Sequence, residues 1–233
     1  PAGLVADLRE YQDAGFRWLS WLRDRGFGGV LADDMGLGKT VQALTLLLSE
    51  HEKPGPASLV VAPTSVIYAW KEEAERFTPD LKVCVFHGPN RPPVPPEDAD
   101  VIVTSYGLLR HAAPAFERPW RVMILDEAQR IKNPQSHVAR VARRLSAQYR
   151  YALTGTPLEN RLLELWSIFE CLMPGFFGPR QAFRRRYSVP IERDRDEQAL
   201  MRLQRRIRPF ILRRLKSEVA QELPPRQEQI LYC

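Results

Sequence analysis

Short apolar runs alternate along this chain with stretches of helical periodicity. The apolar runs are rich in β-branched residues and predict strands at 29–33, 59–62, 83–86, 101–104, 122–126 and 151–154. Apolar residues that recur every three or four positions predict helices at 39–50, 66–77, 136–145 and 162–171. Strands with few polar interruptions, separated by helices, are typical of a parallel sheet that helices cover on both faces. We therefore expect an α/β fold.

The pattern changes after Pro174. Residues 174–179 (PGFFGP) interrupt regular structure, and the sequence beyond them is basic and helix-like to about Arg206. We therefore expect an α/β domain over residues 1–173, a basic helical protrusion over 174–218 and a connector over 219–233.

Positive charge is concentrated in the predicted protrusion. The whole chain has a formal net charge of +6, and residues 180–216 contain thirteen Lys or Arg against four Asp or Glu. A basic block attached to a nearly neutral domain fits a polyanionic partner. An ordinary solvated basic helix face is the alternative, and charge alone does not separate the two.

Composition argues against several classes of protein. No apolar run approaches the roughly 20 residues that a membrane helix needs, and the opening PAGLVADLRE does not resemble a signal peptide. The three cysteines, Cys84, Cys171 and Cys233, lie far apart, so we expect neither a zinc site nor a disulfide framework. We expect a monomer in a reducing compartment, with no membrane partner.

A glycine-rich segment, DDMGLGKT at 33–40, lies between a predicted strand and a predicted helix. This is the context of a phosphate loop, in which backbone N–H groups at the start of a helix face the phosphates of a nucleotide. Lys39 is expected to reach the β- and γ-phosphates, and the Thr40 hydroxyl to hold Mg²⁺. The expected nucleotide-binding residues of the loop are Met35, Gly36, Leu37, Gly38, Lys39 and Thr40.

Two features of this segment leave room for another interpretation. The general phosphate-loop pattern has glycine where this chain has Asp33, so the match is a variant one. The alternative is a tight glycine turn followed by a surface lysine.

An acidic pair, Asp126–Glu127, follows the strand predicted at 122–126. Ligands of α/β sheets bind at the carboxyl ends of the strands. There Asp126 would bind Mg²⁺, and Glu127 would orient the attacking water. Alone, such a pair equally fits the acidic start of a helix. Together with the phosphate loop, it predicts a site for ATP and Mg²⁺.

Several stretches, in order along nearly the whole chain, resemble the first motor lobe of Swi/Snf-type DNA translocases in helicase superfamily two. They are Leu8–Gln12 (LREYQ), Leu31–Thr40 (LADDMGLGKT), Val61–Pro63 with Trp70, Asp126–Asn133 (DEAQRIKN), Leu153–Asn160 (LTGTPLEN) and Ile207–Pro225 (IRPFILRRLKSEVAQELPP). The resemblance implies a RecA-like parallel sheet with a helical protrusion. It also implies ATP-dependent movement along double-stranded DNA.

The resemblance assigns roles at the ATP site. Asp126, Glu127 and Lys39 would be catalytic together with Gln129, which stands where many members have histidine. The Gln129 amide can bond the γ-phosphate region but does not titrate near neutral pH. Gln12 would contact adenine, although it could instead only cap a helix. The glutamine form is similar to bacterial and archaeal branches, which implies the cytoplasm or nucleoid; a eukaryotic source would imply the nucleus.

The resemblance also assigns residues to the DNA-facing edge and to its coupling with ATP. Pro63, Thr64, Thr104 and Ser105 would contact DNA phosphates, and Thr154, Gly155 and Thr156 would couple the ATP state to the grip on DNA. The alternatives are that Thr104 and Ser105 cap the helix that follows, and that residues 154–157 form only a turn. Trp70 is expected in the core.

The family's second RecA-like lobe supplies arginines that complete the ATPase site, and nothing in these 233 residues resembles it. The resemblance therefore implies partnership with a second lobe of the same polypeptide, and weak hydrolysis by this lobe alone. Two other functions stay open: a lobe of a strand-separating helicase of the same superfamily, and a nucleotide-dependent interaction module whose basic block binds an acidic protein.

Overall fold

A computed structural model describes residues 1–155 and 162–219 of the chain. Within these residues, seven parallel strands form one sheet in the order β3-β4-β2-β5-β6-β1-β7. The strands are β1 (Gly29–Leu31), β2 (Ser58–Ala62), β3 (Val83–Val85), β4 (Val101–Ser105), β5 (Trp120–Asp126), β6 (Ala147–Leu153) and β7 (Ile211–Leu212). The predicted α/β fold is confirmed.

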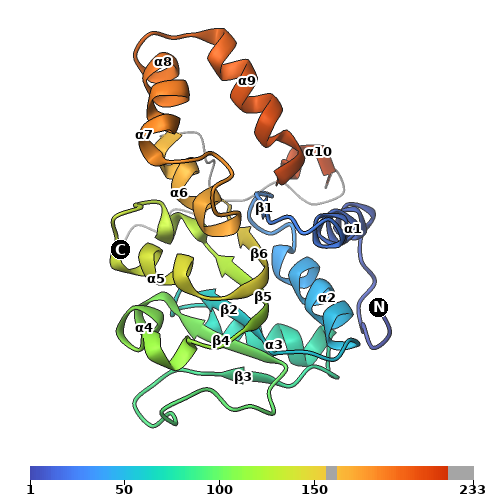
Figure 1. Cartoon of the computed structure of the whole chain (residues 1–233). Helices are drawn as coiled ribbons and strands as arrows, with labels where there is room; N and C mark the ends of the chain where they lie inside the picture. The colour runs from blue at the N-terminus through green and yellow to red at the C-terminus, as the bar shows by residue number, and fades with distance from the viewer. Residues whose placement is uncertain (156–161, 220–233) are drawn as a thin grey trace, which may run out of the picture.

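Helices cover both faces of the sheet (Figure 1). One face carries α1 (Glu10–Asp24), α2 (Lys39–His51) and α3 (Ile67–Phe77); the other carries α4 (Tyr106–His111), α5 (His137–Arg144) and α6 (Leu162–Leu172). Successive strand residues supply the two faces in turn: Val60 packs in the core beside α2, and Val61 in the core beside α6. Because both faces are buried, the strands have no polar face, which is why they appear as continuous apolar runs.

A helical arm extends beyond the sheet, at the top of Figure 1. It consists of α7 (Arg180–Phe183), a π-helical turn (Arg184–Ser188), α8 (Val189–Glu192) and α9 (Glu197–Ile207). Its root is an aromatic cluster in which the ring of Phe177 lies 4.8 Å from that of Phe183 and 6.3 Å from that of Tyr187. Arg184, Arg185 and Arg186 are exposed.

The remaining regular elements are short. They are 3₁₀ helices at Ala113–Phe116, Ala128–Ile131 and Arg208–Phe210, and the helix α10 (Lys216–Val219). No helix of the described residues is both long enough and apolar enough to cross a membrane.

Two elements have no counterpart in the sequence pattern. The helix α1 covers the segment around Gln12, and its buried Leu19 and Leu22 pack against the sheet. The strand β7 pairs with β1 although it lies in the segment predicted as protrusion. Its two residues are followed by two arginines, so its apolar run is too short to indicate a strand. Only the pairing with β1 makes it one.

Candidate functional site

The predicted motif residues gather along one edge of the sheet. The phosphate loop follows β1, Thr154 follows β6, and Asp126 ends β5. Since β5, β6 and β1 are neighbours and parallel, their carboxyl ends lie side by side. Three segments that are distant in sequence therefore share one site at the edge where α/β sheets hold ligands.

The phosphate loop turns sharply into α2. Gly36 and Gly38 have φ angles of 83° and 74°, in the left-handed region that glycine enters without strain. A Cβ at Gly38 would lie 2.5 Å from Nε2 of Gln12, so a side chain here would also displace the Gln12 amide. The buried Leu37 anchors the loop, while Met35 is 76% exposed. The loop therefore presents its backbone at the start of a helix, as an anion site requires.

Lys39 is the first residue of α2, and its side chain folds back over the loop. Its Nζ donates to the carbonyl oxygens of Asp33 (2.8 Å) and Asp34 (3.2 Å). Burial lowers the pKa of Lys39, and nearby carboxylates, Glu127 first among them, oppose that shift. The ammonium group is thus held in place among negative charges before any ligand arrives.

Gln12 caps the start of α1 and also contacts the phosphate loop. Its Oε1 accepts from the N–H of Arg9 (3.0 Å), which caps the helix, and its Nε2 donates to the carbonyl of Leu37 (3.3 Å) in the phosphate loop. The capping alternative is therefore observed, and it places the amide against the loop. The adenine contact stays a prediction.

Two hydrogen bonds hold the carboxylate of Asp126, the first residue of the acidic pair. Oδ2 of Asp126 accepts from the indole Nε1 of Trp70 (2.9 Å), and Oδ1 accepts from the N–H of Glu127 (2.9 Å). Burial raises the pKa of Asp126, and the bond from Trp70 is the largest opposing effect. Glu73 lies close enough that burial first, and then the charge of Asp126, raise its pKa.

A chain of hydrogen bonds joins the acidic pair to the segment after β6. Nε2 of Gln129 donates to Oε2 of Glu127 (2.8 Å), and the Thr154 hydroxyl donates to Oε1 of Gln129 (3.2 Å). Because a carboxylate only accepts, this orientation of the amide suits both partners. Gln129 can therefore transmit the position of Thr154 to Glu127.

Gly155 completes the contact between the segment after β6 and the phosphate loop. A Cβ at Gly155 would lie 2.9 Å from Cγ of Met35 and 3.7 Å from Nζ of Lys39. Gly155 thus lies against the loop, where a side chain would crowd it. The third predicted coupling residue, Thr156, lies outside the described residues.

Oxygen ligands for a hard cation are available at the same edge. Thr40, in the first turn of α2, and Asp126, at the end of β5, are both half-buried. A hydroxyl and a carboxylate suit Mg²⁺, which binds few protein oxygens and retains several waters. Each Asp126 oxygen accepts one hydrogen bond and keeps a lone pair for a cation.

The residues predicted to face DNA fall into two groups. Thr64 is exposed and Pro63 half-buried, just after β2. Thr104 and Ser105 are buried: the Thr104 hydroxyl donates to the carbonyl of Phe86 (3.0 Å), and the Ser105 hydroxyl accepts from the N–H of Leu108 (3.1 Å) at the start of α4. Both hydroxyls are used inside the fold, which favours the capping alternative, and a DNA contact by these two residues stays a prediction. Ser105 is the helix cap that the alternative proposed.

Sequence reasoning missed three side chains that support the site. Trp70 was expected only as core, yet it bonds Asp126. Gln42 and Arg214 contact the phosphate loop; no motif marked Gln42, and Arg214 lies in the quoted Ile207–Pro225 stretch but had no predicted role. The sequence did offer one signal for Arg214. Asp33 stands where the general pattern has glycine, and a buried carboxylate needs a cationic partner.

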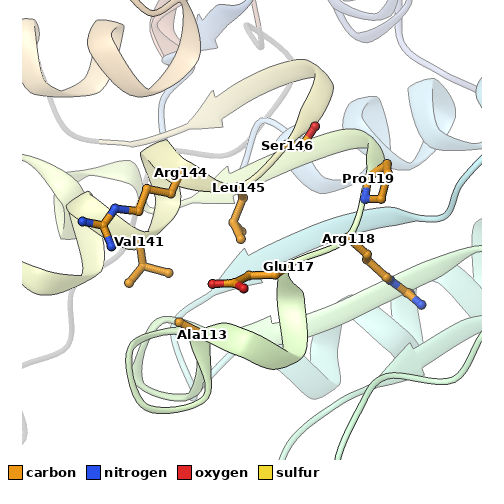
Figure 2. A pocket seen from close by; sticks show the side chains of 8 residues that line it. All are labelled: Ala113, Glu117, Arg118, Pro119, Val141, Arg144, Leu145 and Ser146. Atoms are coloured by element: carbon orange, nitrogen blue, oxygen red, sulfur yellow. The ribbon is translucent and has the colours of Figure 1, made fainter.

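A cavity of about 320 Å³ lies away from these residues (Figure 2). It is lined by Ala113, Glu117, Arg118, Pro119, Val141, Arg144, Leu145 and Ser146. These residues include those just before β5 and β6, at the amino ends of the strands. The cavity therefore lies at the edge opposite the motifs and contains no predicted site residue.

Comparisons with known proteins agree with this geometry. The Bacillus subtilis protein YwqA is 46% identical over 232 residues, covering 95% of this chain and 25% of the relative. The ISWI chromatin-remodeling complex ATPase CHR11 of Arabidopsis thaliana is 40% identical, covering 99% of this chain and 23% of the relative. The chain thus spans about a quarter of the length of these relatives.

A solved structure matches at the level of the fold. The SWI2/SNF2 ATPase core of Sulfolobus solfataricus in complex with double-stranded DNA superposes with a TM-score of 0.90 at 41% identity. The match covers 96% of this chain and 48% of that one. A family model described as the SNF2-related domain matches residues 11–233. The motifs lie along one edge of a matching fold, and the family model covers most of the sequence. The chain therefore belongs to the SNF2-related family.

Proposed function

We propose that this chain is the first, ATP-binding motor lobe of an ATP-dependent double-stranded DNA translocase or remodeller. The observation that carries the proposal is the shared edge, where Lys39 of the phosphate loop faces the Asp126–Glu127 pair and a hydrogen-bond chain continues to Thr154. A phosphate cradle, a cation ligand and a water-orienting carboxylate are the parts that ATP hydrolysis needs.

The residues of the edge fit ATP with Mg²⁺. Backbone N–H groups of residues 36–40 would bind the phosphates, and Lys39 would exchange its contacts with loop carbonyls for the β- and γ-phosphates. Thr40 and Asp126 would hold Mg²⁺, which neutralises phosphate charge when bound. Gln12 would contact the adenine.

Glu127 is proposed to orient the water that attacks the terminal phosphate. Its carboxylate is positioned by Gln129, and Gln129 in turn by Thr154. A movement of the segment after β6 would therefore move the water-orienting group. This gives a physical route by which the grip on DNA and the state of ATP influence each other.

The DNA contact is proposed for the surface after β2, where Thr64 is exposed beside Pro63. Hydroxyl contacts to phosphates position a protein on DNA without reading sequence. The Sulfolobus relative, solved with double-stranded DNA, supports this partner. We propose that efficient hydrolysis needs the second RecA-like lobe of the same polypeptide, because arginine fingers contribute about 10³–10⁵ in rate in related reactions.

The test is the ATPase rate of the protein with both lobes, measured without nucleic acid and with single-stranded DNA, duplex DNA or duplex RNA. Stimulation by duplex DNA alone is the expected result. Preference for a single strand or RNA would favour the strand-separating helicase. Indifference to every nucleic acid would overturn the translocase proposal in favour of a nucleotide-dependent interaction module. Steep weakening of DNA binding with salt would confirm phosphate contacts.

A further inference from the structure

The segment of residues 211–216, named the strap here, lies directly against the start of the phosphate loop. It begins as β7 beside β1, with Leu212 paired to Leu31. Beyond the strand, the N–H of Ala32 donates to the carbonyl of Leu212 (2.7 Å), and the N–H of Asp34 donates to the carbonyl of Arg214 (3.1 Å). The backbone of the strap therefore continues the sheet into the loop.

An ion pair between the buried Asp33 and the half-buried Arg214 fixes the two segments to each other. Asp33 has no exposed surface, and Nε of Arg214 donates to its Oδ1 at 2.9 Å while Nη2 donates to its Oδ2. The partners are 181 positions apart in sequence. A carboxylate without exposed surface requires such a cation, which explains how this loop tolerates aspartate where the general pattern has glycine.

The guanidinium of Arg214 is also connected to the rest of the loop through Gln42 and through the backbone at Tyr11. Nη2 of Arg214 also donates to Oε1 of Gln42 (2.8 Å), whose Nε2 donates to the carbonyl of Gly38 (3.1 Å). Nη1 donates to the carbonyl of Tyr11, the neighbour of Gln12. Gln12 in turn bonds the carbonyl of Leu37. The contacts of Arg214 therefore extend to Asp33 directly, to Gly38 through Gln42, and to Leu37 through the segment of Tyr11 and Gln12.

The start of the loop is also what holds the catalytic lysine. The Asp33 carbonyl accepts from Nζ of Lys39 at 2.8 Å, and the Asp33 side chain is the one that Arg214 fixes. A shift of the Asp33 backbone would therefore move the ammonium group. The planar guanidinium, with five donors in a fixed arrangement, makes these contacts at once, whereas a lysine ammonium is a single compact charge.

We propose that Arg214 is a positioning residue for nucleotide binding: by holding Asp33, Gln42 and the carbonyl of Tyr11 together, it gives the phosphate loop its binding geometry and makes that geometry depend on the strap. The inference rests on the proposed ATP site. Because the strap carries Arg214, displacement of the strap lowers nucleotide affinity and nucleotide binding opposes that displacement.

The experiment measures ATP–Mg²⁺ affinity by calorimetry, and the thermal unfolding midpoint, for Arg214→Gln, Arg214→Lys and Asp33→Asn, alone and combined with Arg214→Gln. The matched control is Arg121→Gln. Arg121 is a buried arginine, and it bonds the carbonyl of Glu50 at 2.9 Å beside the Glu50 carboxylate, away from the loop. Affinity is measured well below the lowest unfolding midpoint.

The expected result is a separation of affinity from stability. Arg214→Gln weakens ATP–Mg²⁺ binding about tenfold or more, which corresponds to about 1.4 kcal/mol. Arg214→Lys restores only part of it, because it keeps the charge without the fork. The combination with Asp33→Asn loses less than the two single effects added together, since the side chains act as a unit. Arg121→Gln lowers the unfolding midpoint and leaves affinity unchanged.

A purely structural ion pair gives a different result. Arg214→Gln would then lower the unfolding midpoint as Arg121→Gln does, with unchanged affinity, and the inference would be overturned. If Arg214→Gln does not fold, Arg214→Lys decides, because it retains the charge that Asp33 needs: wild-type affinity would refute the positioning role. Failure of the unaltered protein to bind ATP would instead refute the proposed function, so the two failures are distinguishable.

Discussion

The carboxyl edge of the sheet has two halves that differ in how their polar side chains are bonded. After β1, β5 and β6, side chains bond to one another across elements: Gln129 bridges Glu127 and Thr154. At the end of β4, the hydroxyls of Thr104 and Ser105 bond backbone groups of the fold itself, and the Ser105 hydroxyl also lies 3.3 Å from Nδ1 of His87. The first half is held ready for a ligand, whereas in the second the same type of group maintains the strand and helix ends.

The difference shows how well a polar residue at the end of a strand indicates a ligand site. A hydroxyl there can bond a ligand or a helix terminus equally well, since both offer unpaired groups. Carboxylates and a lysine have few such internal uses, because burying them without partners is costly. The charged half of the edge is therefore the more dependable indicator of chemistry.

The comparison can be tested most strongly at Glu127. We expect Glu127→Gln to reduce DNA-stimulated ATP turnover of the two-lobed protein by about 10²–10⁴-fold, the range for losing a positioned acid–base group. ATP affinity should persist, because the amide can still accept from Gln129. Single-turnover and binding measurements distinguish the two effects. Glu117→Gln, at the cavity on the opposite edge, is the control and should turn over normally.

Lys39→Ala should remove most of the ATP–Mg²⁺ affinity. Each charge-assisted bond to phosphate contributes about 1.5–3 kcal/mol, so a loss of about a hundredfold to ten-thousandfold is expected from two such bonds. Calorimetry on the lobe measures it, with the exposed Lys82→Ala as control. Normal ATP binding by the Lys39 variant would contradict the site assignment.

Trp70→Phe should weaken the response to Mg²⁺, and more so at low pH. The indole N–H opposes the rise of the Asp126 pKa, so its loss lets that pKa rise further. A protonated Asp126 cannot hold a cation; activity at limiting Mg²⁺ should therefore fall as the pH is lowered, and at a higher pH in the variant than in the wild type. The effect is measured by titrating Mg²⁺ across the acidic range.

The control for that experiment is Trp120→Phe. Trp120 is equally buried on β5, but its Nε1 donates to the carbonyl of Phe116 at 3.0 Å, at the other end of the strand. It should affect stability without changing the dependence on Mg²⁺. An identical pH profile for both variants would mean that Trp70 acts only by packing.

Ser105→Ala should produce the smallest effect on function. Losing the cap of α4 is expected to lower the free energy of unfolding by about 0.5–2 kcal/mol, with DNA affinity unchanged. Thr64→Ala should do the reverse, weakening DNA binding without loss of stability. Chemical denaturation and a salt-titrated DNA-binding assay measure the two quantities. Weaker DNA binding by Ser105→Ala would show that the two halves of the edge do not differ as described.

Much of the fold and of the charged site could be predicted from local patterns. The strands predicted at 59–62 and 122–126 lie within β2 and β5, and the helix after the phosphate loop begins at Lys39 as expected. Burial on both faces makes such strands apolar throughout. A Gly-x-Gly-Lys-Thr segment between a strand and a helix has few uses besides a phosphate loop. Family resemblance, rather than periodicity, indicated the segment around Gln12 and the role of Thr154.

The rest depended on contacts between distant residues. Nothing in the residues around Trp70 indicates that its indole bonds Asp126, 56 positions away. The two residues of β7 form a strand only because β1 offers an open edge. Burial of Thr104 likewise follows from Phe86 lying opposite it.

The sequence by itself determined that this protein has a parallel α/β sheet, a phosphate loop and an acidic pair. Those properties follow from short-range periodicity and from residue types with few alternative uses. The tertiary structure alone decided which hydroxyls are free, that Trp70 holds Asp126, and that Arg214 holds Asp33. The physical reason is that burial and pairing of a polar group depend on what the fold brings beside it, and its sequence neighbours do not specify that partner.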